Sequence, residues 1–569
     1  MNYYIRGKGS ITFSQHDFIC EGGEGRVYGR GNTVYKIYAD PKKMIAEGKI
    51  AELNTLINLS VIVPEDIILD SKNRPVGFTS RWVKDSWALC KLFTLPFRDK
   101  NQISDEQIRD LILKIKKVIS FIHSRHCLLV DGNEMNYLVD SHNCTIPYFI
   151  DVNSYQTPSY PATALMLTVK DHHTQGFNQL SDWFGFAMIA CQLLIGIHPY
   201  KGKHPNYQRA ALETRMKDNV SIFNPQVSVP RVVKPLDSIP ENYRAWLRAV
   251  CEDGQRLAPP DHFGPACAVV LLDEIIKEVR KFNVTEIQSF IGSVKTARYH
   301  AGTRVVTTDQ HVYIGSKPYT NLNKNALIVF TDKNMSPVSA EIKHGNLLLI
   351  DARTSQQIGF SLAAQELFLS DNTLYVRNGE NLAELRLTDI ANNIIPAVVV
   401  TWKVLPNATQ LFDGFLIQNV FGKMIMTIPY KDENRTSKCL VKPVPELDSY
   451  KIISGKHERG VCMLTGYKGS RLNRITLKFD STYTVYQCQI DEDIDSPTVN
   501  FAVLDTGVVI NITDEEVVEL FRREPESRKV KQITGSGVDS RVRLFSEAGT
   551  AMFYYKNKVY SMTMREEEK

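Results

Sequence analysis

The first part of the chain alternates short apolar runs with polar turns. Two such runs, 19–28 and 33–38, are joined through Gly29-Arg-Gly-Asn32, which is a hairpin turn signal. Residues 61–68 and 76–83 have a similar strand-like composition. The pattern therefore predicts a β-rich unit at the start of the chain.

Helical periodicity replaces this alternation in several later segments. Apolar residues three and four positions apart predict a helix over 104–124, where Ser104 can form a capping box with Gln107. Similar patterns predict three more helices, over residues 42–59, 181–198 and 241–281. The apolar stretch 183–197 is shorter than the roughly twenty residues of a spanning helix, so we interpret it as a buried core helix and expect no membrane span.

Further along, the pattern changes to strands almost without interruption. Strand-like runs follow polar turns and start at residues 303, 346, 373, 414, 460, 507 and 550. Most steps between these starts are about 40–47 residues, close to the four-strand blade of a β-propeller. Six or seven blades fit the length, and a pair of β-sandwiches or an irregular solenoid is the alternative.

Together these patterns predict an α+β bilobal region followed by an all-β region. The expected units are a small lobe over 1–85, a large lobe over 86–283 and a propeller-like interaction domain over 284–569. A chain of 569 residues is long enough for several hydrophobic cores.

The bulk composition narrows the function classes. Hydrophobic residues make up 43% of the chain and charged residues 23%, which is typical of soluble globular proteins. The formal net charge of +5 is small and does not indicate nucleic acid as a partner. The ten cysteines form no Cys-x-x-Cys pair and the start of the chain has no secretory signal, so we expect a cytoplasmic protein with reduced thiols.

A glycine-rich segment, residues 21–27, lies between the first two strand-like runs. The backbone N–H groups of such a hairpin can cover phosphates, and a plain hairpin turn is the alternative. Four positions are therefore candidate nucleotide contacts: Gly22, Gly23, Gly25 and Val27.

The next strand-like run carries Lys36 among apolar residues. A lysine that is buried there must be paired or functional, because burial of a lone ammonium group is unfavourable; the alternative is a solvent-facing lysine on an edge strand. Glu47 and Glu52, on the predicted helix 42–59, are both candidate partners of Lys36. Helical periodicity does not choose between them.

A third set of polar residues lies in the middle of the chain. Asp131 is followed five residues later by Asn136 and, after a short apolar run, by Asp151. This spacing lets one carboxylate meet a substrate hydroxyl while the amide and the second carboxylate hold a metal on nucleotide phosphates. It predicts phosphoryl transfer.

From about residue 17 to 279 the chain resembles the eukaryotic-type protein kinase fold. The matching stretches are Gly22-Gly-Glu-Gly-Arg-Val-Tyr28, Val34-Tyr-Lys-Ile-Tyr38, Asp131-Gly-Asn-Glu-Met-Asn-Tyr-Leu-Val139, Ile150-Asp-Val-Asn-Ser-Tyr-Gln156 and Asp182-Trp-Phe-Gly-Phe-Ala-Met188 through His198-Pro-Tyr200. They are most similar to a divergent bacterial branch, often found with stress-response and tellurite-resistance-type gene clusters.

The resemblance implies a role for each matching residue. The glycine hairpin is expected to cover the phosphates of ATP, and Lys36 to contact them, positioned by Glu47. Asp131 is expected to orient or deprotonate the acceptor hydroxyl, while Asn136 and Asp151 bind Mg²⁺ or Mn²⁺. Lys36, Asp131 and Asn136 are thus the expected catalytic residues. Two further residues are implied to be structural: Asp182, which ties the apolar helix to the catalytic loop, and Arg256.

The chain also departs from the common kinase pattern. Leu129-Val130 replace a His-Arg pair before Asp131, and Val152-Asn153 replace Phe-Gly after Asp151. Asn133 stands where many Ser/Thr kinases have a lysine that stabilises the transferring phosphoryl group.

The predicted function is an ATP-dependent Ser/Thr protein kinase whose propeller-like domain recruits a protein substrate or partner. The alternative is a pseudokinase scaffold that binds nucleotide without phosphoryl transfer. A third interpretation, transfer of AMP, requires the nucleotide to be reversed in the same cleft.

Overall fold

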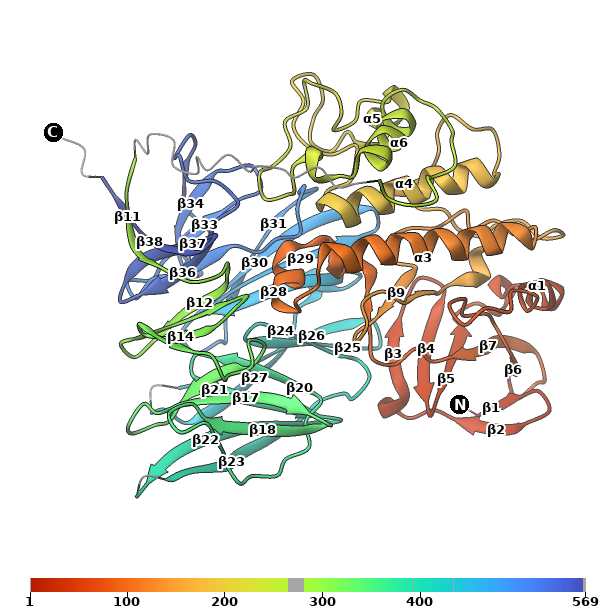
Figure 1. Cartoon of the computed structure of the whole chain (residues 1–569). Helices are drawn as coiled ribbons and strands as arrows, with labels where there is room; N and C mark the ends of the chain where they lie inside the picture. Colours follow the sequence, from red (N-terminus) through yellow and green to blue (C-terminus); the bar gives the residue numbers. More distant parts are fainter. Residues whose placement is uncertain (1, 265–280, 392, 433, 566–569) are drawn as a thin grey trace.

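The computed structural model describes four stretches of the chain: residues 2–264, 281–391, 393–432 and 434–565. We call residues 2–83 the small lobe, residues 84–264 the large lobe and residues 281–565 the all-β region. In Figure 1 the strands of the small lobe, in red, lie beside the helices of the large lobe, and the all-β region, in green to blue, lies next to both.

Among the described residues, the small lobe is a seven-stranded sheet in the order β2-β1-β6-β7-β5-β4-β3. Its strands are β1 (Asn2–Ile5), β2 (Gly9–Thr12), β3 (Phe18–Glu21), β4 (Gly25–Arg30), β5 (Thr33–Tyr38), β6 (Ile67–Leu69) and β7 (Pro75–Arg81). β4 and β5 form the predicted hairpin, in which Arg30 pairs with Thr33. Gly31, with a φ of 61°, makes the turn in the left-handed region that favours glycine.

Helix α1 (Glu47–Leu53) is much shorter than the predicted helix over 42–59. Its buried face contains Ile50 and Leu53. The next apolar position of the helical stripe, Ile57, is 84% exposed, whereas Leu56 is 1% exposed. The long helix is therefore a wrong prediction, because the chain leaves the helical path to bury Leu56.

The large lobe contains a small sheet and five α-helices among its described residues. Its elements are β8 (Ser86–Ala88), β9 (Tyr137–Asp140), β10 (Pro147–Phe149), α2 (Leu95–Lys100), α3 (Asp105–Ser124), α4 (Gln179–Ile195), α5 (Leu212–Asp218) and α6 (Glu241–Cys251). α3 begins at the predicted capping box, where Gln107 N donates to Ser104 Oγ. α4 is buried along most of its length, as expected. The part of the predicted helix 241–281 that covers 265–280 lies outside the described residues.

Short 3₁₀ helices complete the list of helical elements. They are η1 (Gln15–Asp17), η2 (Pro41–Lys43), η3 (Leu89–Phe93), η4 (Val152–Ser154), η5 (Leu167–Val169), η6 (Leu236–Ser238) and η7 (Pro445–Leu447). In the part of the chain that the structure describes, no helix combines the length and the apolar composition needed to cross a membrane.

The described part of the all-β region forms seven four-stranded antiparallel sheets. The first three contain β12 (Val294–His300), β13 (Thr303–Thr308), β14 (Val312–Ile314) and β15 (Lys317–Tyr319); β16 (Leu327–Phe330), β17 (Pro337–Lys343), β18 (Asn346–Asp351) and β19 (Gln356–Gln357); and β20 (Glu366–Ser370), β21 (Thr373–Asn378), β22 (Asn381–Ile390) and β23 (Asn393–Lys403). The next three contain β24 (Thr409–Phe412), β25 (Phe415–Val420), β26 (Lys423–Lys431) and β27 (Ser437–Pro443); β28 (Lys451–Glu458), β29 (Val461–Lys468), β30 (Arg471–Phe479) and β31 (Tyr486–Asp491); and β32 (Phe501–Val503), β33 (Val508–Ile512), β34 (Val518–Arg522) and β35 (Val530–Ile533).

The seventh sheet joins the two ends of the all-β region. It contains β36 (Arg543–Glu547), β37 (Thr550–Tyr555), β38 (Lys558–Met564) and β11 (Phe282–Ser289). β11 pairs with β38, and β36 lies against both β12 and β32. The predicted repeat of four strands is confirmed, and the arrangement is consistent with a β-propeller. The predicted domain boundary at residue 284 falls inside β11.

The all-β region is docked on both lobes. On the small lobe, the ring centroids of Phe421 and Phe18 lie 4.7 Å apart. On the large lobe, Lys201 Nζ lies 2.9 Å from Asp493 Oδ1, and both side chains are buried. Four apolar residues of the all-β region belong to the hydrophobic core of the large lobe: Ile453, Tyr467, Leu472 and Ile494.

Candidate active site

The glycine-rich segment forms a tight hairpin between β3 and β4, in which Gly22 N donates to Gly25 O at 2.9 Å. A Cβ atom on Gly25 would lie 2.0 Å from the carbonyl oxygen of Ile37, so a glycine is required for β4 to approach β5. A Cβ atom on Gly22 or Gly23 would have no described atom within 4 Å. The tip of the hairpin therefore borders open space, as its predicted role at a nucleotide requires.

Lys36 lies on β5, opposite Val27 of β4. Its Nζ lies 2.6 Å from Glu24 Oε2, 3.4 Å from Asn153 Oδ1 and 3.5 Å from Asp151 Oδ1. The Lys36 side chain is 13% exposed. Lys36 is thus buried and paired, and it reaches from the small lobe to the segment that follows β10.

The charge of Lys36 is stabilised by its acidic neighbours. Burial alone lowers the pKa of Lys36, but the charges of Asp151, Tyr38 and Glu24 outweigh it, and the pKa is raised above its ordinary value. The side chain is therefore a fixed positive charge at neutral pH, which suits contact with phosphate oxygens.

The predicted pairing of Lys36 with Glu47 or Glu52 is wrong. Glu47 Oε2 and Oε1 accept hydrogen bonds from Arg6 at 2.7 and 2.8 Å, on the surface. Glu52 accepts a hydrogen bond from Ser159 N at 3.1 Å. Neither glutamate is therefore among the hydrogen-bond partners of Lys36 in the described structure.

Glu24 takes the place of the expected helix partner, and the sequence analysis did not single it out. The signal that could have found it is the hairpin register, since Glu24 lies three residues from Val27, the cross-strand neighbour of Lys36. Asn153, noted only as a departure from the kinase pattern, also joins this cluster.

The loop of Asp131 is held by hydrogen bonds to its own neighbours. Asp131 Oδ1 accepts from Asn133 Nδ2 at 2.9 Å and from Met166 N at 2.7 Å. Asn136 Nδ2 donates to the Asp131 carbonyl at 2.8 Å, and Asp131 Oδ2 lies 3.4 Å away. The Asp131 side chain is 7% exposed. The two residues predicted to act together are therefore in direct contact.

Asp182, in the first turn of α4, anchors this loop. Its carboxylate accepts hydrogen bonds of 2.9 Å from both Leu129 N and Val130 N, and its Oδ2 lies 2.8 Å from His123 Nε2. Val130 has a φ of 61°, an uncommon conformation for a β-branched residue. The buried carboxylate stabilises this conformation, as the resemblance implies for Asp182.

Arg256 binds Asp171, which lies in the segment between Asp151 and α4. Its Nε and Nη2 each donate to the Asp171 carboxylate at 2.7 Å. Burial raises the pKa of Asp171, but the hydrogen bonds from Arg256 and from the other groups around the carboxylate together have a larger, opposite effect. The pKa of Asp171 is therefore lower than its ordinary value. Both groups are therefore charged, and the bidentate pair is structural.

Asn136 and Asp151 are the two residues predicted to bind a metal ion. Ile150 N donates to the Asn136 carbonyl at 3.0 Å, so the two segments run side by side. The Asp151 side chain is 53% exposed, and its backbone has a left-handed φ of 54°. Since Asn136 uses Nδ2 toward Asp131, its Oδ1 remains as a ligand. One carboxylate and one amide oxygen fit Mg²⁺, which keeps several waters and is bound jointly with phosphates. No cluster of three or more His, Cys, Asp or Glu side chains placed for a metal occurs in the described stretches.

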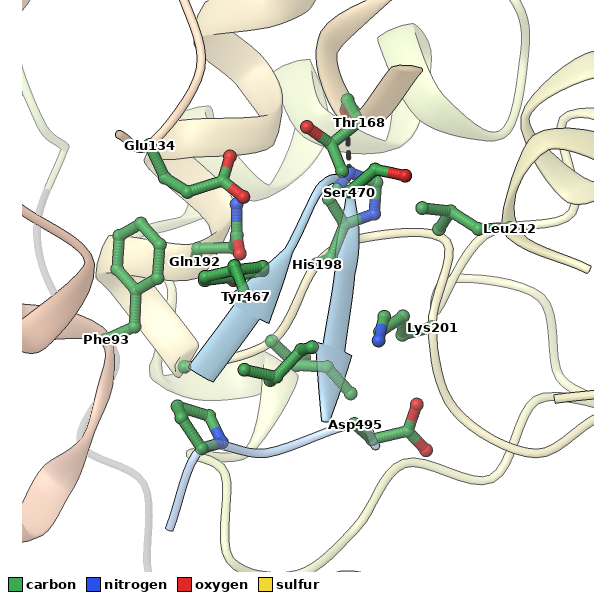
Figure 2. A pocket seen from close by; sticks show the side chains of 14 residues that line it. Phe93, Glu134, Thr168, Gln192, His198, Lys201, Leu212, Tyr467, Ser470 and Asp495 are labelled. Carbon is green, nitrogen blue, oxygen red and sulfur yellow. Dashed lines mark hydrogen bonds between the residues drawn. The ribbon is translucent and has the colours of Figure 1, made fainter. Parts of the chain in front are cut away.

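A small cavity of about 20 Å³ lies where the large lobe meets β29 and β30 (Figure 2). Glu134, Gln192 and Tyr467 are among the residues that line it. Burial raises the pKa of Glu134, and within the described structure its Oε2 has no hydrogen-bond partner. The volume suits one water molecule, so we interpret this cavity as part of the seam between the regions.

No protein-family model matches the sequence, and no curated protein matches it. Among solved structures, the chain is similar to the kinase PK-1 of the Cydia pomonella granulovirus, with 13% identity and a TM-score of 0.31. The similarity covers 42% of this chain and 88% of the viral chain. A TM-score of this size does not establish a shared fold, so we base the function on the contacts of this chain's own residues.

Proposed function

We propose that the protein is an ATP-dependent protein kinase that transfers the γ-phosphoryl group to a Ser or Thr hydroxyl. The supporting observation is a continuous set of contacts between the lobes. Lys36 contacts Asp151, the segment of Asp151 runs beside Asn136, and Asn136 contacts Asp131. Phosphoryl transfer depends mainly on positioning and electrostatic stabilisation, and these are the groups it needs.

In this reaction Lys36 binds phosphate oxygens and exchanges part of its contact with Glu24 for them. Asp131 orients the acceptor hydroxyl and accepts its proton. Asn136 Oδ1 and the Asp151 carboxylate would hold Mg²⁺ or Mn²⁺, which neutralises charge on the phosphates when bound. Resemblance to the divergent bacterial branch of kinases supports these roles and remains a prediction from the motifs.

The second candidate is a pseudokinase that binds nucleotide without transfer. Two observations favour it. Glu24 lies 2.6 Å from Lys36 Nζ, where a phosphate would compete with it, and Asp131 Oδ1 already accepts two hydrogen bonds. Transfer of AMP remains the third possibility for the same cleft.

We also propose that the seven sheets are the blades of a closed propeller that begins at β11 and is preceded by the small and large lobes. Propellers present rigid loops to peptides and proteins, which supports recruitment of a protein substrate or partner in the cytoplasm. Deleting the region is a poor test, because Ile453 and Tyr467 are part of the large-lobe core. The full chain is the appropriate reagent.

The test is incubation of the full-length protein with γ-labelled ATP, Mg²⁺ and protein acceptors. We expect Asp131→Asn and Asp151→Asn to reduce transfer about 100-fold or more, with little change in the thermal midpoint. Equal transfer by the wild type and both variants would exclude the proposed roles.

Mass spectrometry of the products distinguishes phosphate from AMP. A rise in the thermal midpoint with ATP and Mg²⁺, without any product, would identify the pseudokinase instead.

A further inference from the structure

Lys451 brings a charged side chain from the all-β region to the loop of Asp131. It is the first residue of β28, and its Nζ donates a hydrogen bond of 3.1 Å to the backbone carbonyl oxygen of Met135. Met135 directly precedes Asn136 in the sequence. The ammonium group therefore lies beside the segment that carries the candidate catalytic and metal-binding groups.

The all-β region also meets the glycine hairpin, since a Cβ atom on Gly422 would lie 3.7 Å from Glu21 Oε2. Burial raises the pKa of the Cys20 thiol, on β3, to about 11, and the Asp151 carboxylate raises it as well. The charges of Lys451 and Lys36 act in the opposite direction on the same thiol.

Lys36 and Lys451 differ in how their charges are neutralised. Lys36 contacts the carboxylates of Glu24 and Asp151. Lys451 makes its hydrogen bond to a neutral carbonyl, and no ion pair with an acidic side chain is found for it in the described stretches. A partly enclosed ammonium group without a carboxylate partner favours an anionic ligand.

The position of Lys451 is fixed by the packing of β28 and β29. Tyr467, its cross-strand neighbour, is 7% exposed and lies against Glu134 of the large lobe. The pair of Lys201 with Asp493 and the contact of Phe421 with Phe18 hold the same region on both lobes. Lys451 is therefore held beside the loop of Asp131 by a strand of a region that packs on both lobes.

We propose that Lys451 is a nucleotide-binding residue supplied by the all-β region, and that its ammonium group contacts the phosphates of a nucleoside di- or triphosphate. The proposal rests on the nucleotide site of the proposed function, because Met135, the contact of Lys451, directly precedes Asn136 of that site. The loop 131–136 contains Asp131 and Glu134 but no basic residue, so Lys451 adds positive charge where the loop itself has none. An ammonium group has three donors, so Lys451 can bind phosphate and keep its bond to Met135.

The proposal is tested by calorimetric binding of ATP, ADP, AMP and adenosine, each with Mg²⁺, to the full-length protein. We expect Lys451→Met and Lys451→Gln to bind ATP and ADP about 10-fold to 100-fold more weakly, because a charge-assisted contact is lost. Adenosine binding should stay unchanged, and Lys451→Arg should recover most of the ATP affinity. Lys442→Met is the matched control, because Lys442 also donates to a backbone carbonyl, that of Thr484, within the all-β region.

Each other outcome has a definite meaning. Equal loss for all four ligands would show that Lys451 only supports the loop, and tighter ATP binding by Lys451→Met would show that it blocks the cleft. Unchanged ATP binding by the variants would overturn the role of Lys451 alone. If the wild type bound no nucleotide, the nucleotide site of the proposed function would fail, and this proposal with it.

Discussion

The N-terminal lobes and the all-β region use their charged side chains differently. In the lobes, Lys36 and Asp151 come from segments 115 residues apart and meet at a cleft. In the all-β region, ion pairs mostly join residues of the same turn or adjacent strands, as in Arg353 with Asp351 or Arg377 with Glu366. The pair of Lys36 with Asp151 therefore joins two distant segments at the candidate site, whereas these two pairs of the all-β region fix local geometry.

Left-handed backbone occurs in both regions. Five hairpins of the all-β region turn through a pair of residues with positive φ, the second of which is glycine: Ala301-Gly302, His344-Gly345, Phe421-Gly422, Arg459-Gly460 and Ala548-Gly549. In the large lobe, Val130 and Asp151 have positive φ without a following glycine. Val130 is held by Asp182 rather than by turn geometry. Val130 and Asp151 therefore combine left-handed backbone with a place at the candidate site, whereas other left-handed residues of the lobes, such as Asn73 and Asn219, lie elsewhere.

The largest effect is expected where the two regions meet. Lys201→Met should destabilise the full-length protein by about 3–5 kcal/mol, because it leaves the Asp493 carboxylate buried without its partner. Chemical denaturation measures the change. The double variant Lys201→Met with Asp493→Leu should recover much of the loss.

Lys203→Met is the control for this seam. Lys203 pairs with Glu515 across the same boundary, but its side chain is 56% exposed, so its loss should change stability by less than about 1 kcal/mol. If the Lys201 and Lys203 variants were equally stable, the seam would not depend on its buried pair.

A pH titration compares one buried histidine from each region. Burial lowers the pKa of His198, in the large lobe, to about 3 and that of His457, in the all-β region, to about 4. Unfolded histidine has a pKa near 6.5, so the unfolded chain binds more protons below that pH and stability is lost as the pH falls. Each histidine should account for about 2 kcal/mol between pH 7 and pH 5.

The expected variants are His198→Gln and His457→Gln. Each variant should reduce the slope of the unfolding free energy against pH between pH 7 and pH 5. His198 has both ring nitrogens occupied, near Thr168 O at 2.9 Å and Tyr200 N at 3.3 Å, which fixes the neutral form. A slope unchanged in both variants would mean that other groups control acid stability.

The sequence predicted those features whose signals are local. The capping box of α3 and the regular spacing of strands in the all-β region are examples, because each is encoded within a few residues or by repetition. The motif residues Lys36, Asp131, Asn136 and Asp151 also lie together as expected. Their roles with nucleotide and metal stay predictions.

Features that depend on long-range packing were not predicted. Helix α1 ends early because Leu56 is buried instead of Ile57. Periodicity alone does not show which of these two residues is buried. The pairing of Lys36 with Glu24 depends on the fold of a hairpin tip. The contact of Lys451 with Met135 joins residues 316 positions apart, and no local pattern encodes it.

Substitutions in the glycine hairpin separate packing from ligand contact. Gly25→Ala should destabilise the small lobe by about 1–3 kcal/mol, because its Cβ would lie 2.0 Å from the Ile37 carbonyl oxygen. Gly22→Ala should leave stability nearly unchanged, since its Cβ would meet no described atom within 4 Å. Thermal unfolding measures both. Equal destabilisation by the two variants would contradict the geometry of the hairpin.

The smallest effect is expected for the two glutamates that could have paired with Lys36. Glu24→Gln should tighten ATP binding by about 2-fold to 5-fold, because it removes a partly exposed carboxylate that competes with phosphate for Lys36. Glu47→Gln should leave ATP binding unchanged, since Glu47 pairs with Arg6 at the surface. Calorimetric titration of the two variants with ATP and Mg²⁺ measures both affinities. Weaker ATP binding by Glu47→Gln alone would mean that α1 moves to Lys36 when nucleotide binds, and that the contact with Glu24 belongs to the nucleotide-free protein only.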